Sequence, residues 1–323
     1  MPTPVDITAV QRPDLGAIAY EYMLEADQRG FIALMLLPIF EVLMNSAQYP
    51  IIPLEAFLKL QETARGARGK YNRSDYKFEF GNYACKENGW EEVIDDREAA
   101  LYARYFDAEE VGTKRAVDVI LRGQEARVAA KVFNVSNITN TADVAIAWNT
   151  PATAVPRANV YAAKMALRAA TGLEPNVGAC SKKVFDTVML TAEIRDALKY
   201  TNPIEIGGYE AQRRILAQYL GLDNIFVAGA MKDTADKGLS ASLSDIWDDE
   251  YFGLFRISSG GSDLREPCLG RTFLWTAQSP QNIVTESYRD ESVRGNVIRV
   301  RQDTDEAFVF TGAGYLLGNI IHP

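Results

Sequence analysis

The stretch from residue 62 to residue 75, ETARGARGKYNRSD, constrains the fold more than any other part of the chain, because it holds almost nothing that a core would bury. The sequence before it, residues 31–60, is apolar and interrupted by three prolines, which predicts short extended pieces. After it, in YKFEFGNYACKENGW, aromatic and polar residues alternate, as in a half-buried strand. Extended segments on both sides of a polar tip predict a long hairpin that projects from the body.

A long helix is predicted after this hairpin, over residues 96–133. Asp95 stands three residues before Glu98, which is a capping-box arrangement. Beyond this cap, apolar residues recur at helical spacing with charged residues between them: Val117, Ile120, Leu121, Val128 and Val132. At 1.5 Å per residue, such a helix spans about 30 Å or more.

The glycines near residue 172 raise the question of a phosphate-binding loop. A helix is predicted from Pro156 to residue 170, with Gly172 as its C-terminal cap. A short buried strand over 177–180 follows, and Ser181 caps the next helix. A dinucleotide site or P-loop needs the opposite order, in which the strand precedes the glycines and the helix follows them. The stretch therefore turns a corner and binds no phosphate.

The rest of the chain mixes helices and strands without an internal repeat. Helices are predicted near residues 17–25, 191–200 and 209–220, and strands at 224–228 and 251–257. Past Gly270, three further segments are typical of strands: TFLWTAQ, NVIRVRQ and AFVFTG. We expect a polar turn at Asp303–Asp305 to join the last two. The predicted fold class is α+β.

Catalytic motifs are scarce in this sequence. Its single histidine is His322, which removes Ser-His-Asp triads, Cys-His pairs and histidine-based metal sites. The glycines at the C-terminal end do not have dinucleotide-fingerprint spacing, so GAGYLLGNII is interpreted as a close-packed strand. SSGGSD at 258–263 is interpreted as a loop, and Asp248–Glu250 as a solvated turn. We predict no catalytic, cofactor-binding or metal-binding residues. Acid–base chemistry by carboxylates or lysines alone stays open, because it depends on burial.

The charge and cysteine content exclude other classes. A net charge of −9 argues against a surface that grips nucleic acid. The three cysteines form no CxxC pair, as expected for a reducing compartment. The N-terminus has no basic region typical of a signal peptide, and the most apolar stretch, residues 31–44, contains Pro38 and Glu41. We therefore expect a soluble cytosolic chain.

Several stretches, together with the order of elements, resemble the major capsid protein of tailed bacteriophages, and the resemblance covers nearly the whole chain. The stretches are ATGLEPNVGACS, LGLDNIFVAGA, LSDIWDDEYFGLF and EAFVFTGAGYLLGNII. None is a catalytic motif, so the match is one of arrangement.

The resemblance implies the division of the chain. It implies an N-terminal arm with its first strands over 1–47 and a hairpin, called the E-loop in that family, over 48–94. A P domain with the long spine helix covers 95–155. An A domain covers 156–279, and strands return to the P domain over 280–323. The E-loop tip would contact a neighbouring subunit through its basic residues, Arg65, Arg68, Lys70 and Arg73. The acidic partner face would lie around Asp107, Glu109 and Glu110.

The resemblance also implies partners and a location. The chain would assemble with itself into hexamers and pentamers of an icosahedral head that encloses double-stranded DNA without sequence-specific binding. A portal protein and a decoration protein are further partners. Because about 30 residues precede the body, we expect a separate scaffolding protein. The chain would be assembled in the host cytoplasm and end in the virion, with no membrane and no cofactor.

Two alternatives stay open at this point. One is an encapsulin-type shell around an enzyme cargo, on the same fold. The other is an α/β enzyme that uses carboxylates or lysine, which a deep pocket with buried, convergent ionisable groups would favour.

Overall fold

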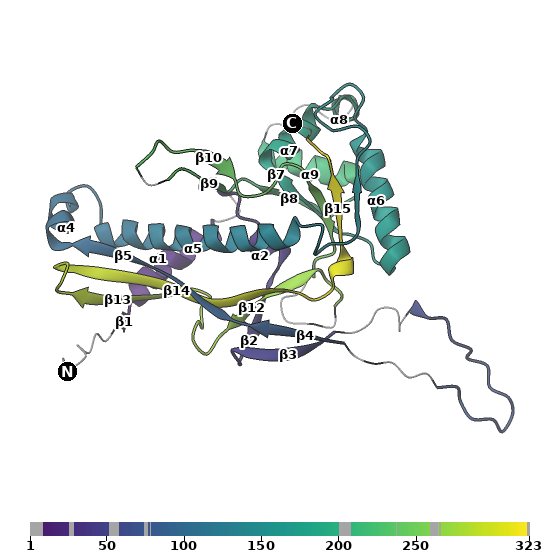
Figure 1. The fold of residues 1–323 in the computed structure, drawn as a ribbon, viewed down its shortest axis with the longest axis horizontal. Coiled ribbons are helices and arrows are strands. Elements are labelled where there is room, and N and C mark those ends of the chain that lie inside the picture. Colours follow the sequence, from purple (N-terminus) through teal and green to yellow (C-terminus); the bar gives the residue numbers. More distant parts are fainter. Residues whose placement is uncertain are drawn as a thin grey trace.

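The computed structural model describes residues 9–25, 29–51, 58–73, 77, 79–199, 208–236, 238–258, 264 and 266–321. Two sheets and one long helix organise these residues (Figure 1). Several residues named above lie outside the described part: Tyr76, Phe78, most of SSGGSD and His322. The predicted α+β class is confirmed.

The larger sheet has six strands, and β14 is its centre. The strand order is β1 (Val10–Gln11), β13 (Val284–Asp290), β14 (Gly295–Phe308), β12 (Gly270–Trp275) and β2 (Ile39–Val42), with β5 (Lys86–Asp95) also paired to β14. All three strands beside β14 run antiparallel to it, whereas β2 runs parallel to β12. β1 and β13 were not predicted.

The polar turn expected at Asp303–Asp305 is wrong, because β14 continues through it as one strand of 14 residues. Both carboxylates have partners that come from distant parts of the chain. Asp303 accepts a hydrogen bond from the Ser279 hydroxyl at 2.8 Å, and Asp305 accepts from the Ala84 amide at 2.9 Å. These bonds let acidic residues lie inside a strand, where their sequence alone indicates a turn.

The smaller sheet has five strands and helices on both faces. Its order is β6 (Thr141–Asp143), β15 (Gly314–Gly318), β11 (Phe252–Phe255), β7 (Val177–Ser181) and β8 (Asn224–Ala228). One face packs on α6 (Pro156–Thr171), α7 (Lys182–Leu190) and α9 (Tyr209–Leu220), and α8 (Ala192–Leu198) joins the same core. The other face packs on α2 (Ala33–Leu36) and the end of α5 (Ala108–Val132).

The corner at residues 171–182 has the predicted order of helix, glycine, strand, serine and helix. Gly172 has a φ of 73° and caps α6 in the left-handed conformation. Ser181 caps α7, because its hydroxyl accepts a hydrogen bond from the Val184 amide at 3.2 Å. The strand between these caps, β7, is buried throughout. The interpretation of GAGYLLGNII as a close-packed final strand is also confirmed by β15.

The helix predicted over 96–133 is two helices in the structure. Asp95 caps the short α4 (Asp96–Tyr102), since its carboxylate accepts from the Arg97 amide at 2.7 Å. Asp107 caps α5 and accepts from the Glu109 amide at 2.8 Å. This second cap starts a new helix where the spacing of apolar residues indicated a continuous one. At the N-terminal end of the chain, α1 (Pro13–Leu24) begins earlier than predicted.

Two smaller hairpins and a short turn complete the fold. β3 (Ser46–Ile51) pairs antiparallel with β4 (Glu79–Ala84), which confirms the projecting hairpin predicted from the sequence (Figure 1). β9 (Met231–Asp233) and β10 (Leu243–Asp245) form a second, unpredicted hairpin. A 3-10 turn, η3 (Thr311–Ala313), precedes β15. No helix in the described ranges has both the length and the apolar character needed to cross a membrane.

Sheet membership does not follow the expected division of the chain. β12 lies within the range expected for the A domain, yet it belongs to the six-stranded sheet with β14. β15 lies within the range expected to return to the P domain, yet it belongs to the five-stranded sheet with β11. The chain therefore crosses between the two sheets more often than its order of segments indicates.

Gly30 lies where the segment before α2 meets the end of β8. Its φ is +78°, and a Cβ added there would lie 2.4 Å from the Gly229 amide nitrogen. The Gly229 amide also donates to the Gly30 carbonyl at 3.0 Å. This close backbone approach requires glycine at position 30.

We expect Gly30→Ala to lower the free energy of unfolding, because the positive φ alone costs about 1–2 kcal/mol and the clash with Gly229 adds to it. Gly16→Ala is the matched control, since an added Cβ there meets nothing within 4 Å. Inside helix α1, alanine is favoured over glycine by about 1 kcal/mol. Chemical denaturation of both variants measures the difference, and equal stabilities would contradict the close approach.

Candidate subunit-contact surfaces

Aromatic rings fix the base of the β3–β4 hairpin to the body. The Tyr83 ring stacks on Phe273 of β12 with centroids 4.5 Å apart, and the Tyr49 ring lies 5.0 Å from the same phenylalanine. The Tyr49 hydroxyl donates to the Phe308 carbonyl at 2.6 Å. Burial raises the pKa of Tyr49 to about 12, so the phenol keeps its proton at neutral pH. The hairpin is thus anchored at its base.

The loop of this hairpin, residues 58–73, is exposed along its whole length. Arg68 has a positive φ of 65°, and the Gly69 amide donates to the Gly66 carbonyl at 3.0 Å, which makes a tight turn. The Arg65 guanidinium lies over the Tyr71 ring, 4.7 Å from its centroid. The sequence places four basic residues here: Arg65, Arg68, Lys70 and Arg73. None of these four forms an ion pair within the described part of the chain.

The expected acidic partner face lies at the start of α5. Only Asp107 has a carboxylate outside any ion pair of the described residues, and it is exposed. Glu109 pairs with Arg12 at 3.1 Å and accepts a hydrogen bond from the Asn296 side chain at 3.1 Å. Glu110 pairs with Lys114 at 2.6 Å. Two of the three predicted acceptors therefore already have partners within their own subunit.

Exposed aromatic rings beside these acids were missed by the sequence analysis. Tyr102 and Phe106 stack with ring centroids 5.2 Å apart, and Tyr105 is 82% exposed. A hollow of about 400 Å³ lies next to them, lined by Asp96, Phe106, Asp107 and Glu109 among others. We name Tyr102, Tyr105, Phe106 and Asp107, with this hollow, the α4–α5 corner. It combines apolar rings with negative charge, which suits a guanidinium.

The hairpin loop and the α4–α5 corner lie at opposite ends of the molecule (Figure 1). The loop extends beyond β3 and β4, whereas α4 lies past the far end of β5 and β14. A single subunit therefore does not bring the predicted basic tip and the predicted acidic face together. They can meet only between two copies.

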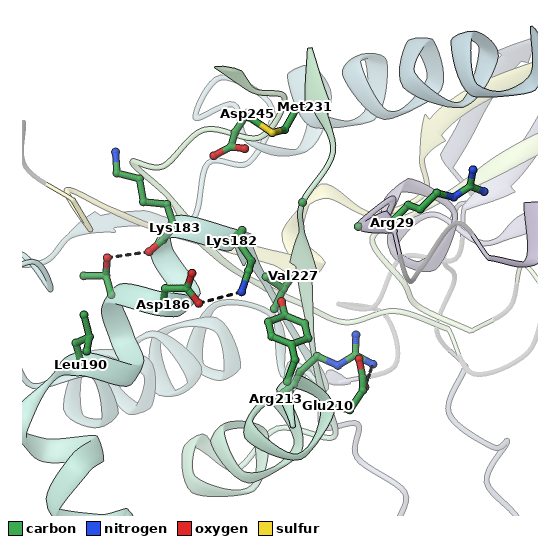
Figure 2. A pocket seen from close by; sticks show the side chains of 14 residues that line it. Arg29, Lys182, Lys183, Asp186, Leu190, Glu210, Arg213, Val227, Met231 and Asp245 are labelled. Atoms are coloured by element: carbon green, nitrogen blue, oxygen red, sulfur yellow. Dashed lines mark hydrogen bonds and ion pairs between the residues drawn. The ribbon is translucent and has the colours of Figure 1, made fainter. Parts of the chain in front are cut away.

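A pocket of about 780 Å³ lies between α7, α9, the end of β8 and residues 29–30 (Figure 2). Four of its charged side chains form ion pairs with one another. Lys182 pairs with Asp186 at 3.0 Å, and Arg213 pairs with Glu210 at 2.8 Å. The Arg29 side chain points away from the others, and its guanidinium lies over the Tyr22 ring, 3.4 Å from the centroid. The two ion pairs and the Arg29 side chain therefore do not converge on one point inside the pocket.

Within the described ranges, no three or more His, Cys, Asp or Glu side chains come together in a way that would hold a metal ion. At the turn Asp248–Glu250, Asp249 accepts a hydrogen bond from the Ser181 hydroxyl at 2.5 Å and pairs with Lys183 at 3.0 Å. Its carboxylate supports the corner between β7 and α7.

No protein-family model matches the sequence, and no curated protein matches it. Solved structures do match. A phage-related protein from Bordetella bronchiseptica is 18% identical, with a TM-score of 0.72 over 98% of this chain and 99% of that chain.

Two further solved structures are similar at greater distance. The capsid protein of cyanophage P-SCSP1u is 11% identical, with a TM-score of 0.52 over 88% of this chain and 86% of that one. The holo-encapsulin complex of Synechococcus elongatus is 10% identical, with a TM-score of 0.53 over 89% and 86%. The chain therefore has the α+β fold of tailed-phage major capsid proteins, as the resemblance in its sequence predicted.

The exposed hairpin loop is expected to be the first site of proteolysis. In the unassembled subunit we expect trypsin to cut first between residues 65 and 73, because protease sites concentrate on exposed loops with few contacts. Arg127 is an internal control, since it lies in α5 and pairs with Glu306 at 2.8 Å. Mass spectrometry of a short digest identifies the first cut. A first cut within α5 would contradict the structure.

Proposed function

We propose that this chain is the structural subunit of an icosahedral phage head, which assembles into hexamers and pentamers and encloses double-stranded DNA. The phage-capsid fold supports a structural shell protein. The observation that carries the proposal is the hairpin loop, residues 58–73, every residue of which is exposed in its own subunit. A loop of this length without structure of its own is unusual in a compact protein unless it has a binding role.

The hairpin is suited to reach a neighbouring copy. Its base is rigid, because Tyr49 and Tyr83 lock it to Phe273, while its tip is free to meet another surface. The tip is basic in a chain whose net charge is −9, so neighbouring copies present complementary charge. We infer that Arg65, Arg68, Lys70 and Arg73 contact the next subunit.

The receiving surface on the neighbour is the acidic face around Asp107, Glu109 and Glu110. Asp107 is the acceptor best placed for a new ion pair, and the rings of Tyr105 and Phe106 offer cation–π contacts. Each exposed pair contributes only about 0.2–1 kcal/mol. The contact repeats on every subunit of a shell, so its total effect on assembly is larger.

The proposed division of the chain keeps the ranges expected from the sequence. Residues 1–47 are the arm, 48–94 the E-loop, 95–155 the P domain, 156–279 the A domain and 280–323 the returning strands. In this division α5 is the spine of the P domain, and α6 to α9 belong to the A domain. β12 lies in the A-domain range but pairs with β14 of the six-stranded sheet, and β15 lies in the range of the returning strands but pairs with β11 of the five-stranded sheet. These two strands therefore tie the two domains together.

The net charge of −9 suits a shell that encloses DNA. A lining that repels phosphates allows packed DNA to move during filling and release. Further proposed partners are a scaffolding protein, a portal protein and a decoration protein. The proposed location is the virion, after assembly in the host cytoplasm. The subunit itself is proposed to have no catalytic role, in keeping with the internally paired charges of the pocket beside α7 and α9.

An encapsulin-type shell is the second candidate, and the similarity to the Synechococcus elongatus encapsulin complex favours it specifically. The contents of purified particles separate the two candidates. Double-stranded DNA inside particles from the native source supports a phage head, whereas a co-purifying enzyme without DNA supports an encapsulin.

Purified protein, with its scaffolding partner supplied, is expected to form closed shells visible by negative-stain electron microscopy. Hexamers and pentamers are the expected units of these shells. A compact monomer that persists at high concentration under the same conditions would overturn the proposal for both kinds of shell.

Charge reversal at the tip tests the electrostatic contact. We expect the double variant Arg65→Glu, Arg68→Glu to give fewer shells than wild type at low salt, and the wild-type yield to fall as ionic strength rises. The measurement is shell yield by light scattering and microscopy across a salt series.

Two controls separate the contact from net charge. Arg214→Glu with Lys232→Glu makes the same charge change at exposed positions away from the tip and should leave the yield unchanged. Arg65→Lys with Arg68→Lys keeps the charge and should assemble. If the tip double variant assembles as well as wild type at low salt, the tip is merely solvated.

A further inference from the structure

A buried carboxylate lies in the middle of α5. Glu125 is 1% exposed, and its two oxygens accept three hydrogen bonds. Oε1 accepts from the Ile32 amide at 2.9 Å and from the Trp247 indole N–H at 2.6 Å. Oε2 accepts from the Ala33 amide at 2.9 Å. Buried carboxylates are rare unless they are paired, so this one requires an explanation.

The three donors belong to two segments. These are the start of α2 and the stretch between β10 and β11. Ile32 and Ala33 form the start of α2, whose first amides lack partners within the helix. Trp247 lies between β10 and β11, and its ring packs edge-on against Phe133, with centroids 4.8 Å apart. One carboxylate therefore joins α5, the start of α2 and the segment leading into the five-stranded sheet.

Among the described residues, no cation forms an ion pair with this carboxylate. Of the charged residues on the surrounding elements, Asp245 of β10 has no ion pair in the described part of the chain, and the others have partners elsewhere. Arg122 pairs with Asp118, Arg127 with Glu306, and Asp249 with Lys183, while the Arg29 guanidinium donates to the Tyr22 carbonyl and the Asp248 carboxylate accepts from the Glu250 amide. Burial raises the pKa of Glu125 to about 7, and the three hydrogen bonds oppose that rise. Both protonation states are therefore accessible near neutral pH.

We propose that Glu125 is a protonation-controlled latch, which holds the start of α2 and Trp247 against α5 when ionised and releases the Ala33 amide when protonated. The reason is geometric, because all three partners are donors and a carboxyl O–H has no acceptor among them. The proton goes to Oε2, which accepts one bond, while Oε1 keeps its two. A hydroxyl oxygen is a weaker acceptor than a carboxylate oxygen and its O–H has to point away from the Ala33 amide, so the Ala33 bond is the one that weakens. Release at Ala33 loosens the segment that carries the Gly30–Gly229 contact. This inference does not depend on the shell function.

The local and global effects of pH run in opposite directions. The pKa in the folded state, about 7, lies above the ordinary value of 4.5. Between these values the folded state binds more protons than the unfolded state, so this group's contribution to stability is present below 4.5 and lost as pH rises through 7. Acid therefore opens the latch locally while it makes the fold, through this group, more stable.

Amide hydrogen exchange, measured residue by residue by NMR on the unassembled subunit, tests the latch. After correction for intrinsic rates, we expect protection of the Ala33 amide to fall about tenfold as the pH drops from 8.5 to 5.5, the ratio that one hydrogen bond gives. In Glu125→Gln, protection should be low and independent of pH, because the amide nitrogen cannot accept. Glu87→Gln, on exposed β5, should behave as wild type.

A second variant keeps the proposal testable if Glu125→Gln does not fold. Trp247→Phe removes one donor from Oε1 without touching Ala33, so the carboxylate loses a bond that lowers its pKa. The midpoint of the Ala33 transition should therefore move to higher pH. Protection that does not vary with pH in wild type, or a midpoint unchanged by Trp247→Phe, would overturn the proposal.

Discussion

Two of the hydrophobic cores of this protein, one under each large sheet, pack on one helix, and the relative placement of the two sheets depends on that shared support. The first half of α5 buries Ala116, Val117 and Ile120 against Ile298 and Val300 of the six-stranded sheet. The second half buries another set against the five-stranded sheet: Val128, Ala129 and Val132. Because one helix belongs to both cores, the two sheets cannot shift relative to each other without exposing apolar surface.

Polar contacts along α5 fix its rotation as well as its position. Arg127 pairs with Glu306 of β14, and Glu125 binds the start of α2 and Trp247. The exposed hairpin is the contrasting element, because its loop contributes nothing to either core. Among the described residues, the body is therefore held by two cores that share α5, whereas the hairpin loop is held only at its base.

Local signals were readable from the sequence, and long-range pairings were not. Gly172 and Ser181 cap adjacent helices through bonds within a few residues, so the corner around them was predicted correctly. The continuity of β14 depends on Ser279 and Ala84, which are far from Asp303 and Asp305 in the chain. The break before Asp107 was missed because the spacing of apolar residues does not indicate where a second N-cap starts a new helix.

The candidate contact surfaces divide in the same way. The basic tip was visible in the sequence because its four basic residues lie within nine positions of one another, in a stretch with almost nothing to bury. The pairing of Glu109 with Arg12, and the rings beside Asp107, depend on how separate segments meet. Glu125 gave no signal at all, since one acid in an amphipathic helix is ordinarily on the solvated side.

The pairing of β14 has a mechanical consequence. This strand pairs with β5 over ten positions, with β13 over seven and with β12 over five. Antiparallel hydrogen bonds run perpendicular to the strands, so tension along β14 loads them together in shear. Tension applied at the loop of the β3–β4 pair pulls both strands in the same direction, so it does not separate their six paired positions. Because β4 leads directly into β5, that tension is passed to the strand that shares ten paired positions with β14.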